Sequence, residues 1–273
     1  MWSILIPSTP DGQEALIAAL WEQGTCGIIE ESGGLRAFFE DSVDPTQLES
    51  MPFQPLPREL RREPVSPPSF AHEDWEPILA GKRFLIAPPW LDATVPPGRV
   101  RLTIDAAMAF GTGRHETTQL CLEALEKHLK PGALVLDIGC GSGILSAAAR
   151  LLDAGPIFSC DIHEDAIQAA RQCSQAPLFL GSADAIRPAV ADLVIANISA
   201  RIVDHIAADL KRILKPGALL ILSGFIADNR PKYFEAVEET VLDNWLCWIC
   251  RPEGIHPLLD SSDPNVHPQD WWL

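Results

Sequence analysis

Long hydrophobic runs are missing from this 273-residue sequence. No apolar stretch approaches the ~20 residues that a membrane-spanning helix needs, which argues against a membrane protein. Residues 1–10 have no basic start, and the apolar stretch Ile4–Ile6 is too short for a signal peptide. The seven cysteines show no spacing of a disulfide framework, which fits a reducing compartment. We therefore expect a cytoplasmic protein.

Positive charge is also scarce. Lys and Arg number 21 against 37 Asp and Glu, which gives a formal net charge of −16 and a pI of about 4.7. Such a surface repels the phosphates of nucleic acids and anionic membranes, and it attracts basic partners. The densest basic segment, Arg58–Arg62, holds three arginines around one glutamate. The charge predicts a basic partner, no direct nucleic acid substrate and no membrane contact.

The sequence lacks a pattern of metal ligands. No two of the seven histidines sit at metal-binding spacing. The pair Cys247 and Cys250 has no second pair to complete a zinc site, and its flanks contain Trp245, Leu246, Trp248 and Ile249. Free cysteines in apolar surroundings are usually buried. We predict a buried strand here and no metal.

The chain divides at a proline-rich stretch. Seven prolines fall between Pro45 and Pro68, which disfavours helix and central strand alike. Before it, the pattern predicts a strand, a helix and two strands, at Trp2–Ile6, Gln13–Glu22, Gly27–Glu30 and Leu35–Glu40. We predict a small α+β recognition domain at 1–44, a linker at 45–70, a large domain at 71–251 and an acidic tail at 252–273.

The large domain shows a regular alternation of strands and helices. Strand-like segments at Arg83–Ala87 and Val100–Ile104 precede it. The predicted strands are Leu134–Ile138, Ile157–Cys160, Leu178–Leu180, Leu193–Ala196, Ala218–Leu222 and Trp245–Cys250. The predicted helices are Ile144–Leu152, Glu164–Cys173, Ala200–Leu214 and Arg230–Thr240. This alternation predicts an α/β fold, a Rossmann-like doubly wound sheet with its ligand loops at the carboxyl ends of the strands.

The first of these strands leads into a glycine-rich loop with Gly139, Gly141 and Gly143. Glycines let the backbone turn sharply and approach a ligand closely at the start of the next helix. Ile144 breaks the dinucleotide fingerprint, and no Gly-Lys-Ser/Thr sequence follows, so the loop is neither a dinucleotide site nor a P-loop. Asp137, two residues before the first glycine, suits a cationic ligand. The sulfonium and ammonium of S-adenosylmethionine fit this requirement.

Two further carboxylates follow neighbouring strands. Asp161 closes the second strand, 22 residues after Gly139, where a carboxylate can accept hydrogen bonds from both ribose hydroxyls. Asp184 follows the third strand and offers an acceptor for an adenine amino group. Together with the glycine loop, these residues resemble class I S-adenosylmethionine-dependent methyltransferases over about residues 105–250. The resemblance is specific for the cofactor and not for the substrate.

Two segments narrow the resemblance. Residues 110–118, Phe-Gly-Thr-Gly-Arg-His-Glu-Thr-Thr, and the segment Ala196–Ile198 are similar to motifs of the ribosomal protein L11 methyltransferases, the PrmA family. The resemblance implies that cofactor contacts come from Thr118, Gly139, Asp161 and Asn197. It also implies a small N-terminal unit that captures ribosomal protein L11. The chain departs from the family at Arg114 and Glu116, where threonine and proline are common.

The resemblance implies methyl transfer to lysine or N-terminal amines, which requires a neutral amine held at near-attack distance. We expect Asn197 to orient that nitrogen and Phe110 to form a wall of the pocket. His115 is a candidate general base or a structural residue. Asn197 is followed by Ile-Ser-Ala, without the aromatic platform on which a flipped base would stack. Another protein substrate, a small-molecule substrate and a cofactor-binding scaffold without activity remain alternatives.

Overall fold

The computed structural model describes residues 2–7, 16–17, 20, 23–25, 27–31, 34–39, 43–44, 48, 60–61, 76–104 and 113–256. The chain forms two compact units, and each is described by itself. One contains Met1–Asp74 and His267–Leu273, and the other contains Trp75–Val266. The predicted boundaries at 44/45, 70/71 and 251/252 stay predictions.

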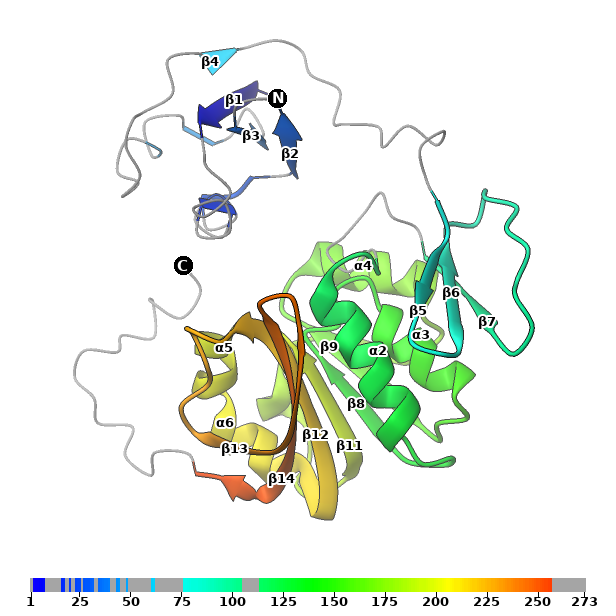
Figure 1. The fold of residues 1–273 in the computed structure, drawn as a ribbon. Coiled ribbons are helices and arrows are strands. Elements are labelled where there is room, and N and C mark those ends of the chain that lie inside the picture. The colour runs from blue at the N-terminus through cyan, green and yellow to red at the C-terminus, as the bar shows by residue number, and fades with distance from the viewer. Residues whose placement is uncertain are drawn as a thin grey trace, which may run out of the picture. The chain divides into compact units, whose positions relative to one another are not determined.

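The first unit contains a four-stranded sheet in the order β2-β3-β1-β4 (Figure 1). Its strands are β1 (Trp2–Pro7), β2 (Gly27–Glu31), β3 (Gly34–Phe39) and β4 (Leu60–Arg61). Every pairing is antiparallel, and Trp2 stacks on Phe39 with ring centroids 4.5 Å apart. Leu16 and Leu20, from the predicted helix Gln13–Glu22, are buried in the core of this unit. Most of that helix lies outside the described residues.

The second unit begins with a three-stranded sheet, β5-β6-β7, formed by β5 (Ile78–Ala80), β6 (Phe84–Ala87) and β7 (Val100–Thr103). The parallel pair β6–β7 confirms the two strand-like segments. Arg99 fixes the turn between β5 and β6, because its guanidinium donates to the carbonyl oxygens of Ala80, Gly81 and Phe84. Helix α2 (Glu116–His128) follows.

A seven-stranded sheet in the order β10-β9-β8-β11-β12-β14-β13 forms the centre of this unit (Figure 1). Its strands are β8 (Val135–Ile138), β9 (Ile157–Asp161), β10 (Leu178–Leu180), β11 (Ala191–Asn197), β12 (Leu214–Ile226), β13 (Phe234–Leu242) and β14 (Trp245–Ile255). The first five in spatial order are parallel, and β14 runs antiparallel to both of its neighbours. The predicted doubly wound sheet is confirmed.

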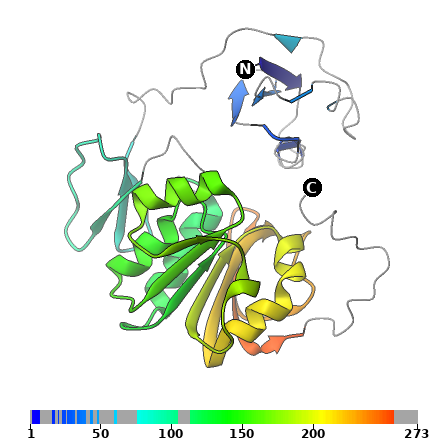
Figure 2. The same ribbon diagram turned by 180° about the vertical axis from the view of Figure 1, so that it is seen from behind.

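Helices cover both faces of this sheet. Apolar side chains of α2 and α3 (Ile144–Leu151) pack with Val135 and Leu193 on one face. Those of α5 (Ala200–His205) and α6 (Ala207–Ile213) pack on the other, and α4 (Glu164–Cys173) lies beside α3. Helix α2 is in front of the sheet in Figure 1, and the yellow helices α5 and α6 are in front in Figure 2. Double coverage explains why these strands are apolar without alternation.

One predicted element is wrong. The segment Arg230–Thr240 was expected to be a helix, but Phe234–Leu242 forms the edge strand β13. Val237 and Val241 have the i, i+4 spacing of a helix face, yet they are 59% and 54% exposed, so that spacing marks no buried face. The segment is a strand because its backbone pairs antiparallel with β14, from Phe234 opposite Ile255 to Leu242 opposite Trp245.

Two smaller differences follow along the chain. The predicted helix Ala200–Leu214 divides into α5 and α6 at Ile206, and the final strand continues beyond Cys250 to Ile255. Within the described ranges, no helix is long and apolar enough to cross a membrane.

Candidate functional site

The strand order reverses between β8 and β11, and the loops after these two strands diverge there. In an open α/β sheet such a switch point at the carboxyl ends of the strands is where ligands bind. Gly139 follows β8, Asp161 ends β9, Asp184 follows β10 and Asn197 ends β11. The fold thus brings residues from four separate parts of the sequence to one edge of the sheet.

The glycine loop has the left-handed backbone that the sequence predicts. The φ angles of Gly139, Gly141 and Gly143 are 71°, 51° and 78°. A Cβ atom on Gly139 would lie 2.5 Å from Ile198 Cγ2, and one on Gly143 would lie 3.1 Å from the Cβ atoms of Ala170 and Ser174 in and after α4. Gly139 therefore permits contact between two ligand loops, while Gly143 permits contact between helices.

The amides of this loop are already engaged within the protein. Gly139 N donates to Cys160 O at 2.9 Å, and Gly143 N donates to Cys140 O at 2.8 Å. Gly141 N donates to Asp161 Oδ2 at 3.0 Å. The glycines therefore shape the loop and leave space for a ligand, rather than offering these N–H groups to it.

Asp161 holds the loop and keeps acceptor capacity for a ligand. Its Oδ1 accepts from His163 N at 3.0 Å, and its Oδ2 accepts from Gly141 N. A carboxylate has about four acceptor positions, so two remain. The side chain is 7% exposed, at the position that the sequence assigns to ribose recognition.

Asp137 lies below the loop. It is 1% exposed, and its Oδ2 accepts from Ser146 Oγ at 2.6 Å, which also lies 2.6 Å from Ser159 Oγ. Burial raises its pKa from 3.8 to about 6, hydrogen bonds from Ser146 oppose this shift, and the charge of Asp161 adds to it. The predicted role toward a cationic ligand would therefore act through charge from beneath the loop. Ser146 was not found by sequence reasoning.

Two buried side-chain oxygens have no hydrogen-bond partner among the described residues. They are Thr118 Oγ1 and Asn197 Oδ1, both from residues that sequence analysis assigns to the cofactor. An unsatisfied buried polar atom costs about 1–3 kcal/mol, so such atoms are rare unless a ligand or water completes them. This observation fits a polar ligand at the end of β11 and the start of α2.

The turn after Asn197 is held from two sides. Ile198 N donates to Ser223 O at 3.0 Å, and a Cβ atom on Gly224 would lie 2.5 Å from Ile198 O. Gly224 has a φ of 97° and sits at a bulge in the β12–β14 pairing. With Gly139 on the other side, it fixes Ile198. Sequence reasoning missed Gly224, although a Ser-Gly pair inside an apolar strand is a signal for a bulge.

His115 has a structural role in the start of α2. It is the N-cap residue, its Nδ1 accepts from Thr117 N at 3.3 Å, and its ring meets Trp245 edge-on with centroids 4.6 Å apart. His115 therefore caps the N-terminus of α2. Phe110, which the sequence analysis predicts as a catalytic residue together with Asn197, lies outside the described residues.

The Cys247–Cys250 pair is not a metal site. Both residues are buried in β14, but Cys247 packs with the cluster under α2 and Cys250 with the cluster under α5 and α6. Residues three apart on a strand point to opposite faces, which separates the thiols. Over the described ranges, no group of three His, Cys, Asp or Glu residues could hold a metal ion.

The seven-stranded sheet, the glycine loop and the carboxylates after β9 and β10 define a methyltransferase-type Rossmann-like domain. A search against sequence families matches residues 69–249 to the family described as "Ribosomal protein L11 methyltransferase (PrmA)". The chain belongs to this family.

Individual relatives agree. Ribosomal protein L11 methyltransferases from Burkholderia ambifaria and Symbiobacterium thermophilum align with 64% of this chain and are 39% and 37% identical to it over the aligned residues. The alignments cover 61% and 60% of the relatives' own length. The chain thus spans about three fifths of these relatives. The crystal structure of a ribosomal protein L11 methylase from Lactobacillus delbrueckii subsp. bulgaricus superimposes with a TM-score of 0.57 at 27% identity, covering 65% of this chain and 99% of that one.

Proposed function

We propose that this chain is an S-adenosylmethionine-dependent methyltransferase of lysine or N-terminal amines of ribosomal protein L11. The observation that carries the proposal is a pair of buried oxygens without a hydrogen-bond partner among the described residues, Thr118 Oγ1 in α2 and Asn197 Oδ1 at the end of β11, in a chain of the PrmA family.

The residues present fit the proposed cofactor. Asp161 has free acceptor positions for ribose hydroxyls, and Asp184 is exposed at the end of β10, where it can accept from the adenine amino group. Ile162 follows Asp161 and is 37% exposed, so it offers an apolar surface for the purine ring. Asp137 would supply a negative charge that favours a cationic sulfonium. When bound, S-adenosylmethionine supplies a methyl group already activated for displacement.

The protein's main task in this chemistry is to hold the attacking amine. Asn197 Oδ1 would accept a hydrogen bond from the attacking amine and so orient the amine nitrogen, leaving the nitrogen lone pair free to attack. Positioning of this kind contributes several kcal/mol to catalysis, because it replaces a bimolecular encounter by a fixed geometry. We assign no side chain as general base.

The negative net charge of this chain supports a basic protein as the substrate. The net charge of −16 favours encounter with a basic ribosomal protein and disfavours direct binding of nucleic acid or an anionic membrane. We propose that the reaction takes place in the cytoplasm, and that residues 1–44 capture the substrate.

The test is a transfer assay with labelled S-adenosylmethionine. The chain is incubated with purified unmethylated L11 protein and, separately, with ribosomal extract and small metabolites from the same strain. We expect label on L11 amines. Label only on another protein or on a metabolite would overturn the assignment of L11 as the substrate. Cofactor binding without any labelled product would favour the alternative of a cofactor-binding scaffold without activity.

An Asn197→Ala variant tests the assignment of the amine-orienting residue. We expect kcat to fall about a hundredfold, because misplacement of a reacting group by about 1 Å has an effect of that size. The free energy of unfolding should not fall, since the substitution removes an unsatisfied buried oxygen. Asn229→Ala, at an exposed position after β12, is the matched control and should keep the wild-type rate. An unchanged kcat for Asn197→Ala would contradict the role.

A further inference from the structure

The loop that carries Asp184 is held by an arginine from helix α6, which packs beside it. This loop contains the short helix η4 (Ala183–Ala185), and Arg212 lies on α6. Arg212 Nη1 donates to Ile186 O at 2.5 Å, and Nη2 donates to Ala183 O at 3.0 Å and to Asp184 O at 3.2 Å. One guanidinium therefore binds three carbonyl oxygens of a single turn.

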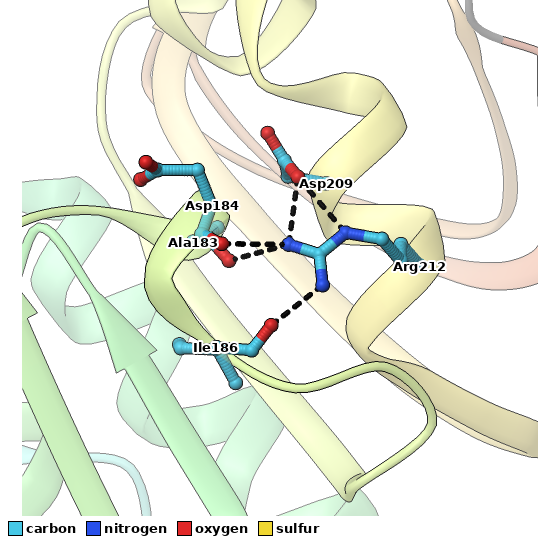
Figure 3. Close-up of polar contacts among 5 residues, drawn as sticks. All are labelled: Ala183, Asp184, Ile186, Asp209 and Arg212. Atoms are coloured by element: carbon cyan, nitrogen blue, oxygen red, sulfur yellow. Dashed lines mark hydrogen bonds and ion pairs between the residues drawn. The ribbon is translucent and has the colours of Figure 1, made fainter.

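The guanidinium is itself fixed in place. Asp209, three residues earlier on α6, accepts from Arg212 Nη2 at 2.7 Å and from Nε at 3.0 Å (Figure 3). An arginine has five N–H donors in a rigid planar fork, so it can satisfy a carboxylate and several carbonyls at once. A lysine, with one ammonium group, cannot reproduce this arrangement.

The main chain of Arg212 holds the far end of the same loop. Its carbonyl oxygen accepts from Ala189 N at 2.9 Å, and Val190 N donates to Ile213 O at 2.9 Å. Ala189 has a φ of 52°, a conformation that a residue with a Cβ adopts at a cost of about 1 kcal/mol or more. Contacts on both sides of the loop thus impose a shape that it would not keep alone.

The side chain of Asp184 is left free by this arrangement. Arg212 engages the carbonyl of Asp184 and not its carboxylate, and Figure 3 shows the carboxylate turned away from the guanidinium. The residue is exposed. The contacts fix the backbone at Asp184, and its acceptor stays available to a ligand.

We infer that Arg212 is a positioning residue for adenine recognition. Arg212 holds the turn in the conformation that presents the Asp184 carboxylate to the 6-amino group of the cofactor. Asp209 in turn orients the Arg212 guanidinium. The inference rests on the proposed use of S-adenosylmethionine. It adds the prediction that a residue on α6 sets the selectivity for the purine.

The test measures binding of two ligands that differ at the 6-position, S-adenosylhomocysteine and S-inosylhomocysteine, by calorimetry. The wild type should prefer the adenosine ligand about tenfold or more, as expected for a hydrogen bond to a charged acceptor. In Arg212→Ala this preference should fall at least threefold, and Arg212→Lys should not restore it. Because the ratio is taken within one preparation, partial loss of folded protein does not change it.

Two further variants make the test specific. Arg187→Ala removes an exposed arginine just after Ile186 and should keep the wild-type ratio. In an Asp184→Ala background, Arg212→Ala should lower the ratio no further, because Arg212 acts through Asp184. Wild-type selectivity in Arg212→Ala, or a further fall in the double variant, would overturn the inference. If the wild type bound neither ligand, the proposed use of S-adenosylmethionine would be overturned instead.

Discussion

The buried carboxyl of Asp137 should make the folded protein less stable above pH 6, where this group is ionised, than below pH 4, where it is protonated. Burial raises the pKa of Asp137 from 3.8 to about 6 in the folded chain. One pKa unit corresponds to 1.36 kcal/mol, so ionisation of this group opposes folding by about 3 kcal/mol at neutral pH. A raised folded-state pKa means that the favourable contribution is present below pH 4 and is lost as the pH rises through 6.

Asp137→Asn removes this ionisation and keeps an oxygen that can accept from Ser146 Oγ. We expect the free energy of unfolding of the variant to exceed that of the wild type by up to about 3 kcal/mol above pH 7. The difference should largely disappear at pH 4, where the wild-type group is protonated. Urea titrations of both proteins between pH 4 and pH 8 measure it.

A carboxylate with the opposite shift provides the control. Hydrogen bonds from Lys215 and from the backbone of Leu134 lower the pKa of Asp192, so its contribution is present at neutral pH and is lost in acid. Asp192→Asn should therefore lose stability at neutral pH. A difference between Asp137→Asn and wild type that is constant with pH, or a variant less stable at pH 7.5, would refute the assigned burial effect.

The same variant should bind the proposed cofactor more weakly. An ionised Asp137 attracts the sulfonium and ammonium, while the amide of asparagine carries no charge. Higher stability with lower affinity is the trade-off expected where a strained group serves a site.

Two other predictions concern the ligand loops. Asp161→Ala should weaken S-adenosylhomocysteine binding by roughly 1–3 kcal/mol, measured by calorimetry, because it removes the ribose acceptor and the anchor of Gly141 N; an unchanged Kd would exclude the ribose role. Gly224→Ala should lower the free energy of unfolding by about 2–4 kcal/mol in urea, since its Cβ would clash with the backbone of Ile198. Gly217→Ala, with a similar positive φ but open space around it, should lose about 1 kcal/mol, and equal losses would contradict the steric argument.

The parallel part of the sheet and the candidate site could be predicted because their signals are local. A continuous apolar segment such as Leu193–Ala196, followed by the polar Asn197, marks both the strand and its ligand-binding end. The order of these elements then places the loops together, since parallel strands share one carboxyl edge.

The remainder depends on contacts between distant parts of the chain. Nothing near Phe234–Leu242 shows that β14 will pair with it, and its valines imitate a helix face. The role of Arg212 depends on a turn 26 to 29 residues away. Gly224 is constrained by Ile198, which lies in the turn after another strand, β11. Such constraints have no periodicity that a single sequence reveals.

The loops of the site are held by the protein itself, which bears on how a ligand would bind. Asp161 anchors the glycine loop, Gly139 and Gly224 enclose the turn after Asn197, and Arg212 fixes the turn at Asp184. A ligand therefore spends little of its binding free energy on ordering them. The unpartnered oxygens of Thr118 and Asn197 instead store an unfavourable 1–3 kcal/mol or so each. Under the proposed function, donors on the cofactor and on the amine would recover that energy, so these two atoms would favour polar ligands over apolar ones.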